Sequence, residues 1–325
     1  MNIYHSLFEL PASLGPVVAT IGNFDGVHCG HRWVLSQVNA RARQLGLKSL
    51  AFTFDPHPVR ILRPELPHSL ITPLEPKLQL LATTGLDAVL VLPFTPELSQ
   101  LSAAAFTQQV LVDALHVREV HEGENFRFGH GAAVDIHGLA ALGRDLGFTT
   151  QAYDPFLLRG APVSSSRIRK LISTGQISHA RALLGRPFSV QSTPAPGRGF
   201  GTRYTVPTIN LAPYPELLPA NGVYITSFRI GDESFQAVTN VGNRPTFGAD
   251  SFTVETHLLN FHEIELTEST PLELTFLLQL REEKRWPTPA LLLAQIKKDI
   301  TRTQRYFHLK NVKRPTPHEV VAARD

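Results

Sequence analysis

The chain has 325 residues, of which 42% are hydrophobic and 18% are charged, the balance of an ordinary globular protein. Two domains are expected at this length, because a single hydrophobic core seldom grows so large. The formal net charge of +3, with no basic run before the C-terminal tail, argues against a protein built to bind nucleic acid.

Cys29 is the single cysteine, which excludes an internal disulfide and fits a reducing compartment. The first residues lack the basic and apolar regions of a secretory signal. No stretch approaches the roughly 18 consecutive apolar residues of a membrane span. We therefore expect a cytoplasmic protein without a membrane partner.

The first half of the chain alternates strand and helix patterns. A β-branched run at residues 17–21 predicts a buried strand, which a glycine-rich turn follows. Apolar residues at helical spacing between Trp33 and Ala42 predict a helix that ends at Gly46. Further strands are predicted at 49–54, 88–92, 119–122 and 148–153, and further helices at 74–81, 103–115 and 139–146. This order predicts an α/β domain with a mostly parallel sheet and helices on both faces.

The pattern changes after two more short helices, predicted at 164–173 and 178–184. Alternating strands then dominate, at 188–191, 223–228, 235–241, 253–259 and 272–280, and predict a small β-barrel. A last helix is predicted to start after Thr288, with an apolar stripe at Leu292, Ile296 and Ile300. The predicted domains are residues 1–184 and 185–309, and residues 310–325 form a loose tail.

A first set of chemical residues lies in the glycine-rich turn between the first predicted strand and helix, at residues 21–31. Backbone N–H groups at a helix N-terminus attract phosphate, and Gly26 and Gly30 let a ligand approach the backbone. His28 and His31 are three residues apart and can face the same anion. The pattern suits stabilisation of charge during phosphate transfer. The alternative is a structural glycine turn with two incidental histidines.

The sequence of this turn resembles a known signature. Gly-x-Phe-Asp-Gly followed by His-x-Gly-His is similar to the nucleotidyltransferase motif, in the form found in the bacterial bifunctional riboflavin kinase/FMN adenylyltransferase (FAD synthetase) family. Three further segments resemble motifs of that family, in the same order: residues 53–58, 123–129 and 164–169. The resemblance implies a Rossmann-like nucleotidyltransferase domain of the His-x-Gly-His type.

The resemblance also implies roles for single residues in FMN adenylylation. His28 and His31 would be catalytic contacts of the ATP phosphates, and Ser164 and Arg167 would bind the triphosphate from a second helix start. His57 and Asn125 would lie at the flavin. The other implied phosphate-binding residues are Gly22, Phe24, Gly26 and Gly30. An oxygen of the FMN phosphate would attack the α-phosphorus of ATP, with Mg²⁺ on the phosphates.

Plainer interpretations exist for three residues of this region. Asp25 either hydrogen-bonds its own turn or binds ligand, and the residues favour neither. His57 lies between two prolines and could be a rigid corner. Cys29 occupies the variable position of His-x-Gly-His and is expected to be a spectator, because no second cysteine completes a thiolate site.

A second set of residues opens the β domain, where a loop with glycines at 197, 199 and 201 precedes Pro-Thr-Ile-Asn. Thr208 and Asn210 share a face of an extended segment and carry hard oxygen ligands that suit Mg²⁺. Alone, this pattern favours an ordinary β-turn loop. Its surroundings resemble the riboflavin kinase domain, in which Gly199 and Gly201 would cover phosphates and Glu255 would be the catalytic glutamate. Further similar segments are 221–224, 240–248 and 280–286.

This loop departs from the family pattern Gly-Phe-Pro-Thr-Ala-Asn, because Thr205, Val206 and Ile209 replace the glycine, the aromatic residue and the alanine. In the first domain Ser166 stands where the family has threonine. We expect an enzyme that converts riboflavin to FMN and FMN to FAD with ATP and Mg²⁺, with these small molecules as its partners and its oligomeric state open. The alternatives are an FMN adenylyltransferase with an inactive kinase domain, a transferase for another phosphate acceptor, and a non-catalytic flavin or RNA binder.

Overall fold

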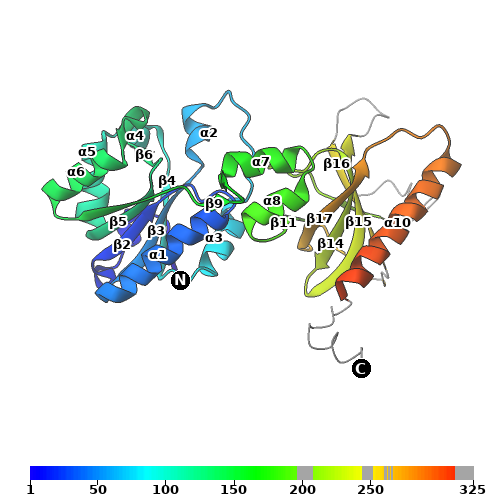
Figure 1. The fold of residues 1–325 in the computed structure, drawn as a ribbon, viewed down its shortest axis with the longest axis horizontal. Coiled ribbons are helices and arrows are strands. Elements are labelled where there is room, and N and C mark those ends of the chain that lie inside the picture. The colour runs from blue at the N-terminus through cyan, green and yellow to red at the C-terminus, as the bar shows by residue number, and fades with distance from the viewer. Residues whose placement is uncertain (196–207, 244–251, 260–261, 263, 265, 312–325) are drawn as a thin grey trace. The chain divides into compact units, whose positions relative to one another are not determined.

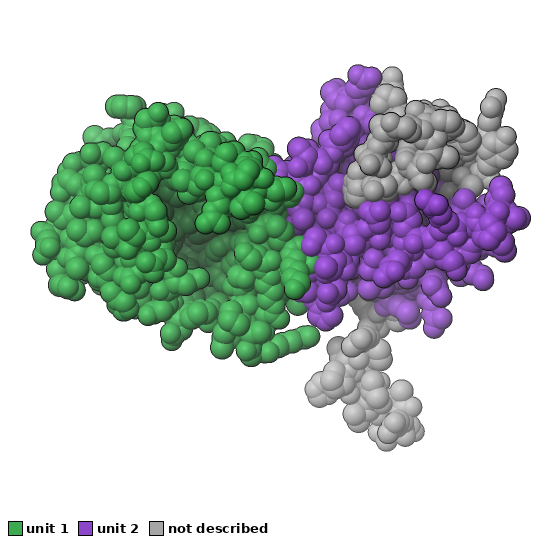
Figure 2. Space-filling view, turned by 90° about the horizontal axis from the view of Figure 1, so that it is seen from above, with its two compact units in different colours: residues 1–170, 182–185 green, residues 171–181, 186–325 purple. Residues whose placement is uncertain are grey.

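The computed structural model describes residues 1–195, 208–243, 252–259, 262, 264 and 266–311. The chain divides into two compact units, residues 1–170 with 182–185 and residues 171–181 with 186–325 (Figure 2). The division falls inside two helices, α7 (Ser165–Ser173) and α8 (Ile177–Leu184). The domain boundary after residue 184 stays a prediction.

The first unit contains a six-stranded parallel sheet in the order β1-β4-β3-β2-β5-β8 (Figure 1). The predicted parallel α/β architecture is therefore confirmed. Two inner strands, β2 and β4, are near-continuous apolar runs, as expected when both faces of a sheet are covered. The strands are β1 (Asn2–Tyr4), β2 (Val17–Ile21), β3 (Lys48–Asp55), β4 (Ala88–Pro93), β5 (Val117–Gly123) and β8 (Thr149–Tyr153).

Two apolar cores lie on the two faces of this sheet. On one face, Val18 and Ala51 pack with Leu35 of α1 (Cys29–Leu45) and Leu81 of α3 (Leu74–Ala82). On the other, strand residues such as Phe52 pack with side chains of α5 (Ala103–Phe106), the π-helical η3 (Thr107–Ala114) and α6 (Ile136–Leu146). Shorter elements are η1 (Leu7–Glu9), η2 (Ala12–Leu14), α2 (Pro58–Leu62), α4 (Pro96–Ser99), η4 (His130–Ala132), the pair β6 (Arg127–Phe128) and β7 (Val134–Asp135), and the pair β9 (Leu157–Leu158) and β10 (Ala161–Pro162).

The strand order reverses between β2 and β5. β3 and β4 follow on one side of β2, whereas β5 and β8 lie on the other. The ladder between β2 and β5 has its last pair at Ala19 and Val120, so the two strands separate toward their carboxyl ends. Ligands of open α/β sheets bind at such a reversal, outside the carboxyl ends of the strands. Figure 2 shows that the surface of this unit is hollowed.

The second unit is an antiparallel half-barrel of seven strands, in the order β11-β17-β14-β15-β16-β13-β12. Its core holds Tyr224, Phe228 and Phe276, all fully buried. Helix α10 (Pro289–Asn311) follows the last strand, as predicted. The strands are β11 (Phe188–Ser192), β12 (Pro194–Ala195), β13 (Ile209–Leu211), β14 (Gly222–Ile230), β15 (Glu233–Asn243), β16 (Phe252–Leu259) and β17 (Leu272–Glu282).

None of the helices within the described ranges combines the length and the apolar character that a membrane crossing requires.

Candidate active sites

The turn between β2 and α1 has an unusual backbone. Phe24 and Val27 have positive φ angles of 48° and 37°, and Gly26 has φ of 84°. A Cβ at Gly26 would also come within 3.3 Å of the Ile71 and Leu184 side chains, so this position requires glycine. Strained backbone of this kind concentrates at functional sites, which supports the interpretation of the turn as a ligand site. Gly22 and Gly30 lie against the rings of Phe24 and His28.

The two histidines of the turn lie together at the start of α1. Their rings are stacked with centroids 3.6 Å apart, and the edge of Phe24 meets His31 at 5.3 Å. The His31 N–H donates to Nδ1 of His28 over 3.2 Å, so His28 caps the helix. Burial, then His28, then Lys77 hold the pKa of His31 well below its ordinary value, and its ring is neutral at pH 7.

One atom of this pair points to a missing ligand. Nδ1 of His31 is buried, and among the described residues it has no hydrogen-bond partner. Buried polar atoms in proteins are almost always paired, and the few exceptions ask for an explanation. An anion at the N-terminus of α1 supplies one, because backbone N–H groups and the helix dipole converge there.

Asp25 is 3% exposed and serves other segments than its own turn. Its carboxylate accepts hydrogen bonds from the N–H groups of Ile71 and Thr72, at 3.2 and 3.0 Å. It also pairs with Nη2 of Arg169 at 2.7 Å. Asp25 therefore joins the turn between β2 and α1 to the loop before α3 and to α7. Within the described part of the chain, the side-chain bonds found for Asp25 go to these two segments and not to its own turn.

The serine-rich segment begins α7. Ser164 accepts a hydrogen bond from the N–H of Arg167 (3.3 Å), and Arg167 donates to the carbonyl of Pro162 (3.0 Å). Both side chains are exposed. Sequence analysis missed Arg169, whose Nε donates to the carbonyl of Ser69 at 2.9 Å besides its pairing with Asp25. The signal that could have found it is a second arginine in the same segment.

The two flavin candidates follow neighbouring strand ends. Asn125 is exposed directly after β5. His57 follows β3 and caps α2 through a 3.3 Å hydrogen bond from the N–H of Val59, as a rigid corner does. Burial, with further contributions from His68, Lys77, Arg169 and Arg60, lowers the pKa of His57 to about 3. Because carboxyl ends of parallel strands meet at one edge, the structure brings both candidates to the edge that carries the histidine pair.

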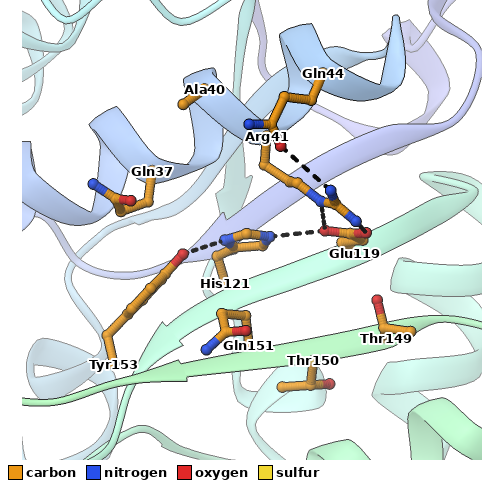
Figure 3. Close-up of a pocket in the computed structure, with 10 residues that line it drawn as sticks. All are labelled: Gln37, Ala40, Arg41, Gln44, Glu119, His121, Thr149, Thr150, Gln151 and Tyr153. Carbon is orange, nitrogen blue, oxygen red and sulfur yellow. Dashed lines mark hydrogen bonds and ion pairs between the residues drawn. The ribbon is translucent and has the colours of Figure 1, made fainter.

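A pocket of about 380 Å³ lies elsewhere on this unit, beside α1 (Figure 3). Four of its polar side chains are linked to one another. Arg41 pairs with Glu119 at 2.7 Å, Glu119 contacts Nε2 of His121 at 3.1 Å, and Nδ1 of His121 contacts the Tyr153 hydroxyl at 2.8 Å. This series of hydrogen bonds and ion pairs links α1 to β5 and β8. The pocket has no helix N-terminus and is not the predicted phosphate site.

In the second unit, the strand register brings two predicted residues together. Asn210 on β13 lies opposite Glu255 on β16, and Asn240 on β15 lies opposite Glu255 from the other side. Directly opposed residues of neighbouring strands share a face, so an amide and a carboxylate lie side by side. Thr208 precedes β13 by one residue. Gly199, Gly201, Thr205 and Val206 lie outside the described residues.

Metal ligands of the acidic, histidine or cysteine kind do not gather in the described part of the chain in groups of three or more. The hard oxygen donors of Thr208 and Asn210 are a different set. They suit a Mg²⁺ ion that keeps most of its contacts with water and substrate phosphates.

Comparison with known proteins covers both units. A family model described as FAD synthetase matches residues 10–167, and one described as riboflavin kinase matches residues 184–307. The bifunctional riboflavin kinase/FMN adenylyltransferase of Pseudomonas fluorescens is 34% identical over 301 residues, 92% of this chain and 96% of that protein. Its counterpart in Escherichia coli K12 is 30% identical over 306 residues, 94% and 96% of the two chains.

A solved structure of a macrolide-efflux protein from Streptococcus pneumoniae has a TM-score of 0.82 at 22% identity. It covers 93% of this chain and 98% of that one, and likeness at this identity shows the fold alone. The matches to both family models and the near full-length relatives show more than a fold. The chain belongs to the bifunctional riboflavin kinase/FMN adenylyltransferase family.

Proposed function

We propose that this protein makes FAD in two steps, phosphorylating riboflavin to FMN and then adenylylating FMN. Family membership supports both activities. The observation that carries the second is the buried Nδ1 of His31 at a helix N-terminus, which has no hydrogen-bond partner among the described residues. We assign adenylylation to residues 1–184 and phosphorylation to residues 185–309, and the single cysteine favours the cytoplasm.

In adenylylation, a phosphate oxygen of FMN attacks the α-phosphorus of ATP, and the bond to the bridging oxygen of pyrophosphate breaks. No covalent enzyme intermediate is needed, so positioning and electrostatics do the work. His28 and His31 contact the ATP phosphates beside the backbone N–H groups of α1. Ser164 and Arg167 meet the triphosphate at the start of α7, and Asn125 and His57 orient the flavin.

In phosphorylation, the riboflavin 5′-hydroxyl attacks the γ-phosphorus of ATP and ADP leaves. Glu255 takes the hydroxyl proton. Thr208 and Asn210 would hold Mg²⁺, which supplies positive charge to the phosphates when bound. The register that sets Asn210 opposite Glu255 supports this assignment, since it puts base and metal ligand on one face.

The second candidate is an adenylyltransferase whose second unit binds flavin without phosphorylating it. The replacements Thr205, Val206 and Ile209 favour it, because they change the loop ahead of the Mg²⁺ ligands. β-Branched Thr205 in particular resists a positive φ that glycine accepts.

One time course separates the candidates. Purified protein is incubated with riboflavin, ATP and Mg²⁺, and the flavins are resolved by chromatography. FMN that rises and then gives way to FAD supports both activities. Conversion of added FMN, with riboflavin untouched, supports the second candidate. If neither flavin changes, both are wrong.

Single variants then assign the sites. Glu255→Gln should abolish FMN formation and leave FAD formation from added FMN. The matched control is Glu273→Gln, on β17 of the same unit, where the glutamate pairs with Arg229. Normal FMN formation by Glu255→Gln would remove Glu255 as the base.

A further inference from the structure

Lys77 is a buried lysine at the edge of the adenylylation site. It lies on α3 and is 7% exposed. Its Nζ donates to the carbonyl of Asn23, in the turn between β2 and α1, and to the hydroxyl of Thr53, on β3, both at 3.3 Å. The ammonium therefore lies between the turn that carries the histidine pair and the strand that leads to His57.

The charge of Lys77 lacks a bonded counterion within the described part of the chain. Its two hydrogen-bond acceptors are neutral, and no ion pair to it is found there. Asp25 and Asp55 act at longer range: they raise the pKa of Lys77, but burial lowers it more. Asp25 is committed to Arg169, and Asp55 is exposed. Lys77 and Arg169 against Asp25 leave one surplus positive charge in the buried cluster.

A buried ammonium held by two long hydrogen bonds to neutral oxygens is unfavourable unless a further partner arrives. Three N–H groups radiate from Nζ, and two are used. The third, together with the surplus charge, calls for an anionic oxygen. The substrates of the proposed function, FMN and ATP, supply such oxygens.

Lys77 is close enough to both His31 and His57 to act on them electrostatically. Its charge lowers the pKa of His31, assigned to the ATP phosphates, and the pKa of His57, assigned to the flavin side. Burial keeps both histidines neutral, and the charge of Arg169 is neutralised by its ion pair with Asp25. A permanent positive charge is needed where two phosphate groups meet, because their mutual repulsion opposes the attack.

We propose that Lys77 is a further catalytic residue of FMN adenylylation, whose ammonium binds a phosphate oxygen at the point where FMN and ATP meet. Lys77 stays protonated throughout: the new bond joins the FMN phosphate oxygen to the α-phosphorus, and pyrophosphate takes the electrons of the broken bond. The inference rests on the proposed adenylyltransferase activity and adds a group that no motif assigned.

The test compares three substitutions by steady-state FMN adenylylation. Lys77→Met removes charge and hydrogen bonds, Lys77→Gln removes charge but can still donate to Asn23 and Thr53, and Lys77→Arg keeps the charge. Loss of one donor to a developing charge typically lowers kcat by about 100-fold to 1,000-fold, so the first two should fall in this range. Lys77→Arg should keep more activity than either.

The matched control is Lys48→Met. Lys48 begins β3, at the opposite end of the same sheet, and its side chain is 57% exposed in a 3.3 Å pair with Asp87. This variant should adenylylate FMN at the wild-type rate. Thermal unfolding midpoints for all variants separate lost chemistry from lost fold, and Lys77→Gln keeps the test valid if Lys77→Met does not fold.

Wild-type kcat in folded Lys77→Gln would overturn the proposal, because the lysine would then only tie the turn to β3. If the wild-type protein forms no FAD from FMN and ATP, the proposed function fails instead. The anion contact is then tested by calorimetric binding of inorganic pyrophosphate. Binding at least about 10-fold weaker in Lys77→Gln than in Lys48→Met supports the contact, and equal binding contradicts it.

Discussion

Glu122 offers a test of how the sheet holds its reversal point open. It lies on β5 and is 5% exposed, and its Oε1 accepts hydrogen bonds from the Thr20 hydroxyl (3.2 Å) and the Ile21 N–H. The backbone ladder between β2 and β5 ends before Ile21. The carboxyl group therefore takes the place of a strand carbonyl. Burial raises the pKa of Glu122 to about 8, and the two hydrogen bonds oppose this only in part.

The raised pKa sets both the sign and the size of a pH effect. The ordinary value is 4.5, so between pH 4.5 and about 8 the folded state keeps a proton that the unfolded state loses. The contribution of Glu122 to the free energy of unfolding is greatest below pH 4.5. It falls as the pH rises and becomes constant above about pH 8. From about pH 5 to about pH 7 the loss is roughly 2–3 kcal/mol, since each pH unit contributes at most about 1.4 kcal/mol.

Glu122→Gln removes this dependence while keeping an oxygen that accepts from Ile21. The variant pays a constant cost of about 1–3 kcal/mol for an amide N–H without a partner. Relative to the wild type it should therefore gain roughly 2–3 kcal/mol in the free energy of unfolding between about pH 5 and about pH 7. The change with pH is the prediction, since the constant cost cancels.

Urea unfolding at several pH values measures the difference. The chain has two tryptophans, Trp33 in the first unit and Trp286 in the second, so a Trp286→Phe background leaves Trp33 to report the first unit. Glu124→Gln, at a side chain that is 50% exposed, is the control and should change little. Parallel curves for Glu122→Gln and the wild type across this pH range would refute the reasoning.

Three further substitutions test the packing, each by urea unfolding. Arg169→Met should destabilise the first unit by about 3–5 kcal/mol, because it removes the ion-pair partner of the buried Asp25 carboxylate, and Asp25→Asn in the same chain should restore part of the loss. Gly129→Ala should cost at least about 1–3 kcal/mol, since φ is +76° and the new Cβ would lie 2.7 Å from the Ala103 nitrogen. Phe228→Ala, in the core of the second unit, should cost about 3–5 kcal/mol with an unchanged first-unit transition.

Much of the fold follows from local patterns. The strands 17–21 and 88–92 are apolar except for Thr20, and the alternation of strands with helices identified a parallel sheet. Very short elements escaped this reasoning: β1 has three residues and pairs at the sheet edge through β4. The helix predicted at 103–115 forms as α5 followed by a π-helical stretch, a difference in hydrogen bonding that periodicity does not resolve.

Some residues of the candidate sites could likewise be predicted from local motifs, and others could not. Local motifs led to the histidine pair, Ser164 and Glu255. The structure places the histidines at the start of α1, Ser164 at the start of α7, and Glu255 opposite Asn210. Lys77 and Glu122 were missed because their partners are distant in sequence. A signal was present for both. Lys77 occupies an apolar stripe with Leu74, Leu78 and Leu81, and Glu122 ends a buried strand, places where a charge calls for an explanation.

Burial shifts the pKa values of three side chains near the carboxyl edge of the parallel sheet, and it shifts the histidines and the glutamate in opposite directions. Burial keeps His31 and His57 neutral by lowering their pKa values, and it keeps Glu122 neutral by raising its own. Neutral histidines donate hydrogen bonds to phosphate without adding charge, and a neutral Glu122 adds no repulsion toward an anion. The paired Arg169 and Asp25 cancel. On this proposal the surplus charge of Lys77 sets how strongly this edge of the sheet attracts anions. Substitution of this lysine should therefore weaken pyrophosphate binding and also lower the kcat of FMN adenylylation.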